Sequence, residues 1–455
     1  MDTTTERLVD YTLSARYEEL SSEAIETCKT RLLDTLGCVA GGYDHPIAVA
    51  ARQLAGRYSM DTPATILGDG KKVAPEMAAF ANSVMLRVLD MSDNYRVKSG
   101  GHPSDILGAL FAGAELGPRT ETGGKSFLSA IALGYEVYCS CCDAIDLNIQ
   151  GWDQPVYSVL ASALAAGKLL GLNRDQLGHA VALALVPNMA MIQTRQGELS
   201  TWKGCAAANA SRNGVFAALL AQAGFSGPER PIEGKHGLWD IVGEFDWPLT
   251  PGEPPYRAAL TDMKAFPICV HGQTAVWVAL DLRDRFDAAN AESIRVDVYY
   301  RAFEMMGEDT TRWAPKTRET ADHSLPYVVA TALLHGAIDE TAFSDEALRE
   351  PALASLMSRI SVVEDKSLTA LHPESAPCRI TVKMKDGSEI QHELRYQKGH
   401  PGNPMDKEEV RDKFRRLFAN YGETQQAEAV IAAVDNLEDM SDIGSLIELF
   451  AKNST

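Results

Sequence analysis

The sequence predicts a mainly α-helical protein with an α+β part, organised as a large helical domain and a smaller α+β domain. Over roughly the first 260 residues, Ala-, Leu- and Gly-rich segments repeat apolar residues at helical spacing. The Pro- and Gly-rich stretch Pro248–Pro255 ends this pattern, and alternating segments typical of strands follow it. Helical spacing returns after residue 404.

The N-terminal helices are predicted from apolar residues that recur every three to four positions. Turn-forming glycines, such as Gly41-Gly42 and Gly123-Gly124, separate these segments. The expected helices cover Ile25–Val39, Glu76–Leu89, Ile106–Leu116, Lys125–Ala144, Val156–Leu170, Arg174–Leu185 and Lys203–Ala223. We therefore expect a helical domain over residues 1–262.

Strand patterns concentrate between residues 265 and 400. Ile294–Val298 and Met357–Val363 alternate between apolar and polar residues, and Ala321–Ala337 between them has helical spacing. Arg379–Met384 and Ile390–Tyr396 flank an Asp-Gly turn, which favours a hairpin. These patterns predict a smaller α+β domain over residues 265–400.

The C-terminal segment again reads as helix. Asp406 precedes Glu409 by three residues, the spacing of a helix-capping box, and helical patterns cover Thr424–Val434 and Ile443–Ala451. We expect residues 404–455 to pack onto the first domain and complete it.

Composition and charge limit the classes of function. The chain has 455 residues, 45% hydrophobic, with 43 basic and 62 acidic side chains and a net charge of −19. This balance argues against nucleic acid and against an anionic membrane as partners. A small anionic substrate is compatible with it, because a few basic side chains in one pocket override the bulk charge. The N-terminus lacks a signal-peptide pattern and no stretch is apolar enough to span a membrane, so we expect a cytoplasmic protein.

Familiar cofactor motifs are absent from the sequence. The eight cysteines are scattered, which favours buried thiols in a reducing compartment over a metal site. No dinucleotide fingerprint, phosphate-binding loop or zinc-protease motif is present, so neither metal nor cofactor is expected.

Three polar stretches interrupt the apolar patterns and supply the candidate site. In the first, Asp90 and Asp93 end a predicted helix and His102 precedes the next, which suits an acid/base pair. The alternative is that Asp93 is a polar helix end and Ser104 a helix cap.

The second and third stretches contribute cations. Arg195 and Lys203 lie in a polar segment between apolar helices, where a lysine either binds a carboxylate or extends to solvent. Lys264 and His271 lie at the domain boundary, where clefts are common, although such a pair also occurs as a structural element. Together the three stretches suggest a pocket for a polycarboxylate and proton transfer at a carbon next to a carboxylate, since ammonium groups stabilise the charge that develops there.

The whole chain resembles the MmgE/PrpD family, which includes 2-methylcitrate dehydratase, cis-aconitate decarboxylase and iminodisuccinate epimerase. The segments that carry the resemblance, in family order, are Arg31–Gly37, Leu89–Asp105, Gly151–Asp153, Ala165–Leu170, Gly197–Gly204, Phe266-Pro267 and Lys316–Ser324. The resemblance implies a helical domain, a lid-like α+β domain, a homodimer and an active site between the domains that needs no metal or organic cofactor.

The resemblance also implies roles for individual residues. Asp90 and His102 match the family's catalytic aspartate and histidine, and Lys203 and Lys264 match its substrate-binding lysines. Asn94 departs from the family's usual threonine. Gln154 stands where dehydratase-like members have histidine, and glutamine cannot shuttle a proton near neutral pH.

The sequence thus predicts a cofactor-independent lyase that dehydrates a hydroxy-polycarboxylate of the 2-methylcitrate type. We expect His102, oriented by Asp90, to exchange the proton next to a carboxylate, while Lys203 and Lys264, with Arg195, bind carboxylates. Asp93, Gln154 and His271 are further candidates for substrate binding. Decarboxylation of an unsaturated tricarboxylate and epimerisation beside a carboxylate are the alternatives on the same site, and a non-catalytic polycarboxylate-binding protein is a third.

Overall fold

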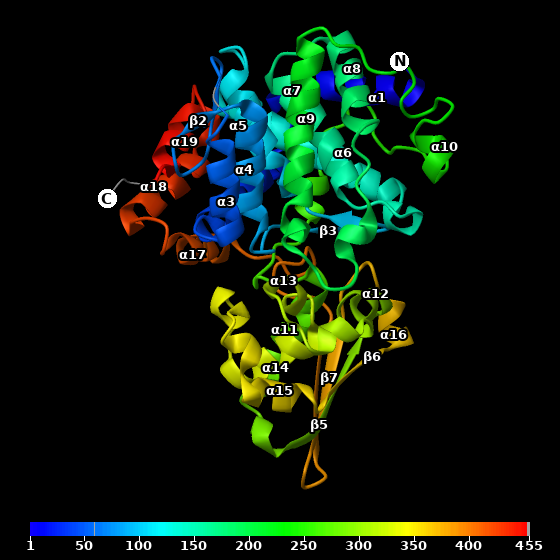
Figure 1. The fold of residues 1–455 in the computed structure, drawn as a ribbon, viewed down its shortest axis with the longest axis vertical. Helices are drawn as coiled ribbons and strands as arrows, with labels where there is room; N and C mark the ends of the chain where they lie inside the picture. The colour runs from blue at the N-terminus through cyan, green and yellow to red at the C-terminus, as the bar shows by residue number, and fades with distance from the viewer. Residues whose placement is uncertain (59, 453–455) are drawn as a thin grey trace.

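A computed structural model describes residues 1–58 and 60–452 of the chain (Figure 1). The larger hydrophobic core collects buried residues between Leu8 and Met263 together with those between Val410 and Phe450. A second core lies among residues between Ile268 and Val382 and includes a small sheet. The predicted class, mainly α with an α+β part, is confirmed.

The helical region is built from long helices that approach each other through small residues. On α9, Gly214 leaves so little room that a methyl group there would lie 2.5 Å from Cβ of Ser162 on α7. The expected helices are confirmed within a few residues at their ends. The helices of this region are α1 (Thr3–Ser14), α2 (Ser22–Gly42), α3 (Pro46–Ala55), α4 (Pro75–Arg87), α5 (Leu107–Leu116), α6 (Gly124–Ala144), α7 (Pro155–Leu169), α8 (Arg174–Leu185), α9 (Ala206–Gln222) and α10 (Leu238–Val242).

The C-terminal helices α17 (Lys407–Phe418), α18 (Thr424–Asp435) and α19 (Gly444–Phe450) return to the helical region, where α17 and α18 pack on α2, and Figure 1 shows all three, in red and orange, at one side of this region. Asp406 begins α17 with the expected capping box. Lys413 of α17 forms a buried ion pair of 2.6 Å with Asp34 of α2. The chain therefore leaves the helical core after residue 263 and re-enters it near residue 410.

The α+β region holds a four-stranded sheet in the order β6-β5-β7-β8. β5 (Ala291–Val298) pairs parallel to β6 (Ile360–Glu364) and antiparallel to β7 (Cys378–Met384). β7 forms the predicted hairpin with β8 (Glu389–Leu394). The helices of this region are α11 (Gln273–Arg283), α12 (Tyr300–Phe303), α13 (Arg318–Ala321), α14 (Leu325–His335), α15 (Pro351–Met357) and α16 (Lys366–Thr369), and α11 packs on α14 and on the hairpin.

Two sequence predictions differ from the structure. The helical region is not purely helical, because β1 (Ala64–Thr65) pairs with β2 (Lys72–Val73) and β3 (Tyr95–Arg96) pairs with β4 (Gly100–Gly101). Two-residue strands are too short to show an alternating pattern. The segment Met357–Val363 is also divided, since α15 ends at Met357 and β6 begins at Ile360.

All eight cysteines are buried free thiols, as the sequence predicts. Among the described residues, no helix is long and apolar enough to cross a membrane.

Candidate active site

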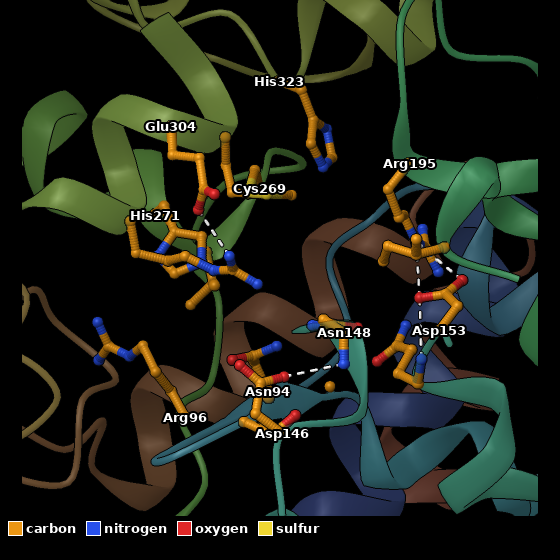
Figure 2. A pocket seen from close by; sticks show the side chains of 18 of the residues that line it. Asn94, Arg96, Asp146, Asn148, Asp153, Arg195, Cys269, His271, Glu304 and His323 are labelled. Carbon is orange, nitrogen blue, oxygen red and sulfur yellow. Dashed lines mark hydrogen bonds and ion pairs between the residues drawn. The ribbon is translucent and has the colours of Figure 1, made fainter. Parts of the chain in front are cut away.

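A cavity of about 980 Å³ is lined by residues of both regions (Figure 2). The helical region contributes the end of α4, the β3–β4 hairpin and the segment before α9, whereas the α+β region contributes the segments before α11 and before α14 and residues of α12. Seven lysines and arginines and six acidic residues line it among the described residues. In a chain with a net charge of −19, this lining is locally enriched in cations.

Asp90 is the electrostatic centre of one wall. It follows the end of α4 with φ = 52°, a left-handed conformation that turns the chain sharply. Its carboxylate lies 2.9 Å from the guanidinium of Arg87, 2.5 Å from the ammonium of Lys264 and 3.2 Å from that of Lys203. Burial alone would raise the pKa of Asp90, but Lys264, Arg87 and Lys203 outweigh it and hold the pKa well below its usual value. Asp90 is therefore an ionised anchor for these cations.

His102 directly follows β4, and the β3–β4 hairpin places the His102 ring next to the residues just after α4. Nδ1 lies 2.6 Å from the backbone oxygen of Asp93. Because a carbonyl only accepts, Nδ1 carries the proton and Nε2 carries a lone pair. Burial lowers the pKa of His102 well below its usual value, and the charges of Arg87 and Lys264 lower it further. The ring is thus neutral and suited to accept a proton.

The prediction that Asp90 orients His102 is wrong. The carboxylate of Asp90 contacts three cations. The group hydrogen-bonded to Nδ1 of His102 is the main-chain carbonyl of Asp93. A neutral carbonyl fixes the tautomer as a carboxylate would, but it does not stabilise an imidazolium to the same extent.

Gln154 fixes the backbone at the end of the β3–β4 hairpin. Its side-chain oxygen accepts hydrogen bonds from the backbone N–H of His102 (3.0 Å) and from the hydroxyl of Tyr138 (3.0 Å). A side chain at Gly101 would meet both groups, since a Cβ there would lie 2.0 Å from the Tyr138 hydroxyl and 2.1 Å from the Gln154 oxygen. The glycine is required at this close approach. Gln154 also lines the cavity.

The two predicted lysines meet at Asp90 but differ in access to the cavity. Lys264 lines it and also donates a 2.9 Å hydrogen bond to the backbone oxygen of Asp90. Lys203 does not line it; this side chain is 2% exposed and donates to both oxygens of Asp322, at 2.7 and 2.6 Å. The alternative in which Lys203 extends to solvent is therefore wrong.

Arg195 lines the cavity with an unused donor. Its Nε donates to both oxygens of Asp153 (3.2 and 3.1 Å) and its Nη1 donates to the backbone oxygen of Lys203 (3.2 Å). Nη2 is buried and has no partner among the described residues. Arg96, which also lines the cavity, has the same feature at Nε. Buried N–H groups of a cation are costly to leave unpaired, so both arginines are suited to bind an anion.

Of the further candidates for substrate binding, His271 lines the cavity and Asp93 does not. The carboxylate of Asp93 accepts a hydrogen bond from the backbone N–H of Ser104 (3.2 Å), and this residue does not line the cavity. His271 lines the cavity with Nδ1 at 2.6 Å from the hydroxyl of Tyr299. Burial, and then the charge of Arg96, lower the pKa of His271 well below its usual value, so its ring is neutral.

Sequence reasoning did not assign a role to Cys269, Asp322 or His323. Cys269 and His323 line the cavity, and Nδ1 of His323 lies 2.5 Å from the carboxylate of Asp322. The signal in the sequence was the adjacent Asp-His pair just before a very apolar helix, within a segment that carried the family resemblance. A pair in that position also suits helix capping, and Ser324 does cap α14.

The carboxylates and the histidine in this wall do not fit a metal ion. Ligand atoms of Asp90, Asp322 and His323 lie within 4.8 Å of one another. The ammonium groups of Lys203 and Lys264 already contact the two carboxylates. A divalent cation there would face two fixed positive charges, which makes the donor set unsuitable.

Comparison with known proteins assigns the chain to a family. The MmgE/PrpD N-terminal domain matches residues 6–248, and the MmgE/PrpD C-terminal domain matches residues 266–439. The chain belongs to the MmgE/PrpD family.

Among its MmgE/PrpD relatives is a 2-methylcitrate dehydratase of Cupriavidus necator, 28% identical over 94% of this chain and 92% of the relative. The 2-methylcitrate dehydratase of Escherichia coli K12 is 27% identical over 93% of this chain and 92% of the relative. Human cis-aconitate decarboxylase is also 27% identical, over 94% of this chain and 91% of the relative. The family and its two kinds of lyase agree with the resemblance seen in the sequence.

Proposed function

We propose that this protein is a cofactor-independent lyase that dehydrates a small hydroxy-polycarboxylate, in the manner of 2-methylcitrate dehydratase. The observation that carries the proposal is one cavity that holds a neutral imidazole with its lone pair on Nε2, an ammonium group and a guanidinium with an unpaired N–H. The similarity to 2-methylcitrate dehydratases over more than nine-tenths of the chain supports it.

In the proposed reaction, Nε2 of His102 removes the proton from the carbon next to a carboxylate. Negative charge then spreads onto the carboxylate oxygens. The ammonium of Lys264 and the free Nη2 of Arg195 stabilise this charge, because fixed donors in a buried site act strongly on developing charge. Asp90 holds Lys264 in place, and Asp322 and Asp90 hold Lys203 behind it.

Decarboxylation and epimerisation are the alternatives on the same residues. Neither must protonate a departing hydroxyl, the step for which Gln154 offers no proton. The similarity to human cis-aconitate decarboxylase makes decarboxylation the reaction to test against dehydration.

The proposal is tested by incubating the protein in D₂O with 2-methylcitrate, cis-aconitate or an amino-dicarboxylate and following each by NMR. We expect water loss from 2-methylcitrate and deuterium at the carbon next to a carboxylate. Release of CO₂ from cis-aconitate without dehydration selects the decarboxylase, and exchange with inversion of the amino-dicarboxylate selects the epimerase. Binding of all three without turnover or exchange contradicts enzymatic function.

We also propose that the protein is a homodimer, as the family resemblance implies. Light scattering after gel filtration is expected to give twice the 49.4 kDa mass of the chain. The monomer mass at micromolar concentration contradicts this.

A further inference from the structure

His323 is a second imidazole of the cavity, and its surroundings differ from those of His102. Figure 2 shows its ring pointing into the open centre of the cavity. Its Nδ1 lies 2.5 Å from Oδ1 of Asp322, 3.3 Å from Nζ of Lys203 and 3.9 Å from Oδ2 of Asp90. A carboxylate only accepts hydrogen bonds, so Nδ1 is the donor in the shortest contact.

The charges around His323 favour its protonated form. Burial and the neighbouring Lys203 lower the pKa of His323, but Cys269 and Asp322 outweigh them, and the net shift is upward from the usual value. For Cys269, burial raises the pKa, but the charge and hydrogen bond of His323 outweigh burial and lower it. Both shifts have the direction expected for an imidazolium beside a thiol with thiolate character.

We propose that His323 is the general acid that protonates the departing hydroxyl group, with Asp322 and Cys269 as its positioning residues. The inference rests on the proposed dehydratase function and supplies the proton donor that Gln154 is unable to provide. The proposal divides the chemistry between the two imidazoles of one cavity. Two titratable groups whose surroundings shift their pKa values in opposite directions are suited to act as base and acid.

The step balances without any further reactant. Nε2 of His102 takes the proton from the carbon next to a carboxylate, and that C–H electron pair forms the new C=C bond. The C–O bond on the neighbouring carbon breaks, and its electron pair leaves with the oxygen. Nε2–H of His323 gives its proton to this oxygen, so that water departs. One proton then passes from His102 to solvent and another from solvent to His323.

The decisive variant is His323→Gln, which keeps a hydrogen-bonding side chain but cannot deliver a proton. We expect kcat for dehydration of 2-methylcitrate to fall by about 100-fold or more, within the range of general-acid effects. Deuterium exchange next to the carboxylate, which needs His102 but not His323, is expected to remain within about threefold of wild type. A His323→Gln enzyme that dehydrates at the wild-type rate overturns the proposal.

A substrate analogue with chloride in place of the departing hydroxyl separates a chemical role from a structural one. Chloride leaves without a proton, so His323→Gln is expected to eliminate it at a rate close to that of wild type. If the variant loses dehydration, chloride elimination and exchange together, His323 is structural and the proposal fails. If the wild-type enzyme neither dehydrates nor exchanges, the proposed function itself fails, which is a distinct result.

The positioning role of Cys269 has its own readout. The groups that face His323 are Asp322 on its own segment, Lys203 before α9, Asp90 after α4, and Cys269 and His271 before α11. In Cys269→Ser, the neighbour that raises the pKa of His323 is lost. The alkaline limb of the plot of kcat against pH is therefore expected to move to lower pH. The matched control is Cys205→Ser, a buried thiol that does not line the cavity, and its profile is expected to match wild type. An unchanged limb in Cys269→Ser contradicts the positioning role.

Discussion

The two imidazoles of the cavity come from different regions and differ in the group that holds Nδ1 and in the charges around the ring. On the helical side, a main-chain carbonyl holds His102 among the cations Arg87 and Lys264. On the α+β side, the carboxylate of Asp322 holds His323 beside the thiol of Cys269. The same side chain is thus favoured as neutral in one wall and as protonated in the other. The residue type alone does not set the role; the neighbouring charges do, since Arg87 and Lys264 lower the pKa of His102, whereas Cys269 and Asp322 raise that of His323.

The largest expected effect comes from removing the neutral imidazole. His102→Gln is expected to lower kcat by about 1,000-fold or more and to abolish deuterium exchange, because no other described residue is proposed to take the substrate proton. Steady-state assays measure kcat, and NMR in D₂O measures the exchange. The matched control is His335→Gln, a half-exposed histidine paired with Glu350. If His102→Gln still exchanges deuterium, the base is a different group.

Removal of a cation should weaken substrate binding and also slow the proton transfer whose developing charge it stabilises. Arg195→Gln deletes the guanidinium whose Nη2 is unpaired, and KM is expected to rise about 10- to 100-fold, the value of a charged hydrogen bond. The control is Arg174→Gln, whose partner is the exposed Asp10. Steady-state kinetics that show an unchanged KM would remove Arg195 from the substrate site.

The hairpin glycine tests how finely the neutral imidazole must be placed. Gly101→Ala would press a methyl group against Tyr138 and Gln154, and we expect a loss of about 1–3 kcal/mol in unfolding free energy and a roughly tenfold lower kcat. Gly204→Ala is the control, because its nearest neighbour atom would lie at 3.6 Å. Equal denaturation midpoints and rates for the two variants would contradict the tight loop.

The smallest expected effect is a pH dependence of stability from Asp105, a buried carboxyl group three residues after His102. Burial raises the pKa of Asp105 to about 7, although Arg87 opposes the shift, and neither carboxylate oxygen has a hydrogen-bond partner among the described residues. The folded state therefore keeps a proton that the unfolded chain releases near pH 4. This contribution to stability is present at low pH and declines as the pH rises through about 7.

Asp105→Asn lacks this decline. We expect the unfolding free energy of the variant minus that of wild type, measured in urea, to be larger at pH 8 than at pH 5 by about 1 kcal/mol or more. An equal difference between the two proteins at both pH values contradicts the raised pKa.

The sequence predicted many of the elements with a long or local pattern, although α1 and α3 were not among the expected helices. Helical spacing in α6 and α7, the Asp386-Gly387 turn of the hairpin and the capping pair Asp406 and Glu409 are all signals that a single stretch of chain contains. The strands β3 and β4, two residues each, contain no such signal, although they place His102.

The site was predictable in its residue types but not in its contacts. Asp90 and Lys264 are 174 residues apart, and no periodicity links them; the family resemblance did. The partner of His102 is a main-chain oxygen, which every residue offers, so residue types were unable to reveal it. His323 lies within a segment that carries the family resemblance, but an Asp-His pair before a helix equally suits capping, so the sequence alone does not reveal its role.

The most direct test of the two-imidazole account is an NMR titration of protein labelled with ¹⁵N-histidine, with His102→Gln and His323→Gln used to assign the two rings. At neutral pH we expect His102 to be protonated at Nδ1 alone and to stay neutral below the usual histidine range, whereas His323 is expected to carry protons on both nitrogens and to lose one only above that range. Two rings that titrate together near the ordinary pKa of about 6.5 would contradict it.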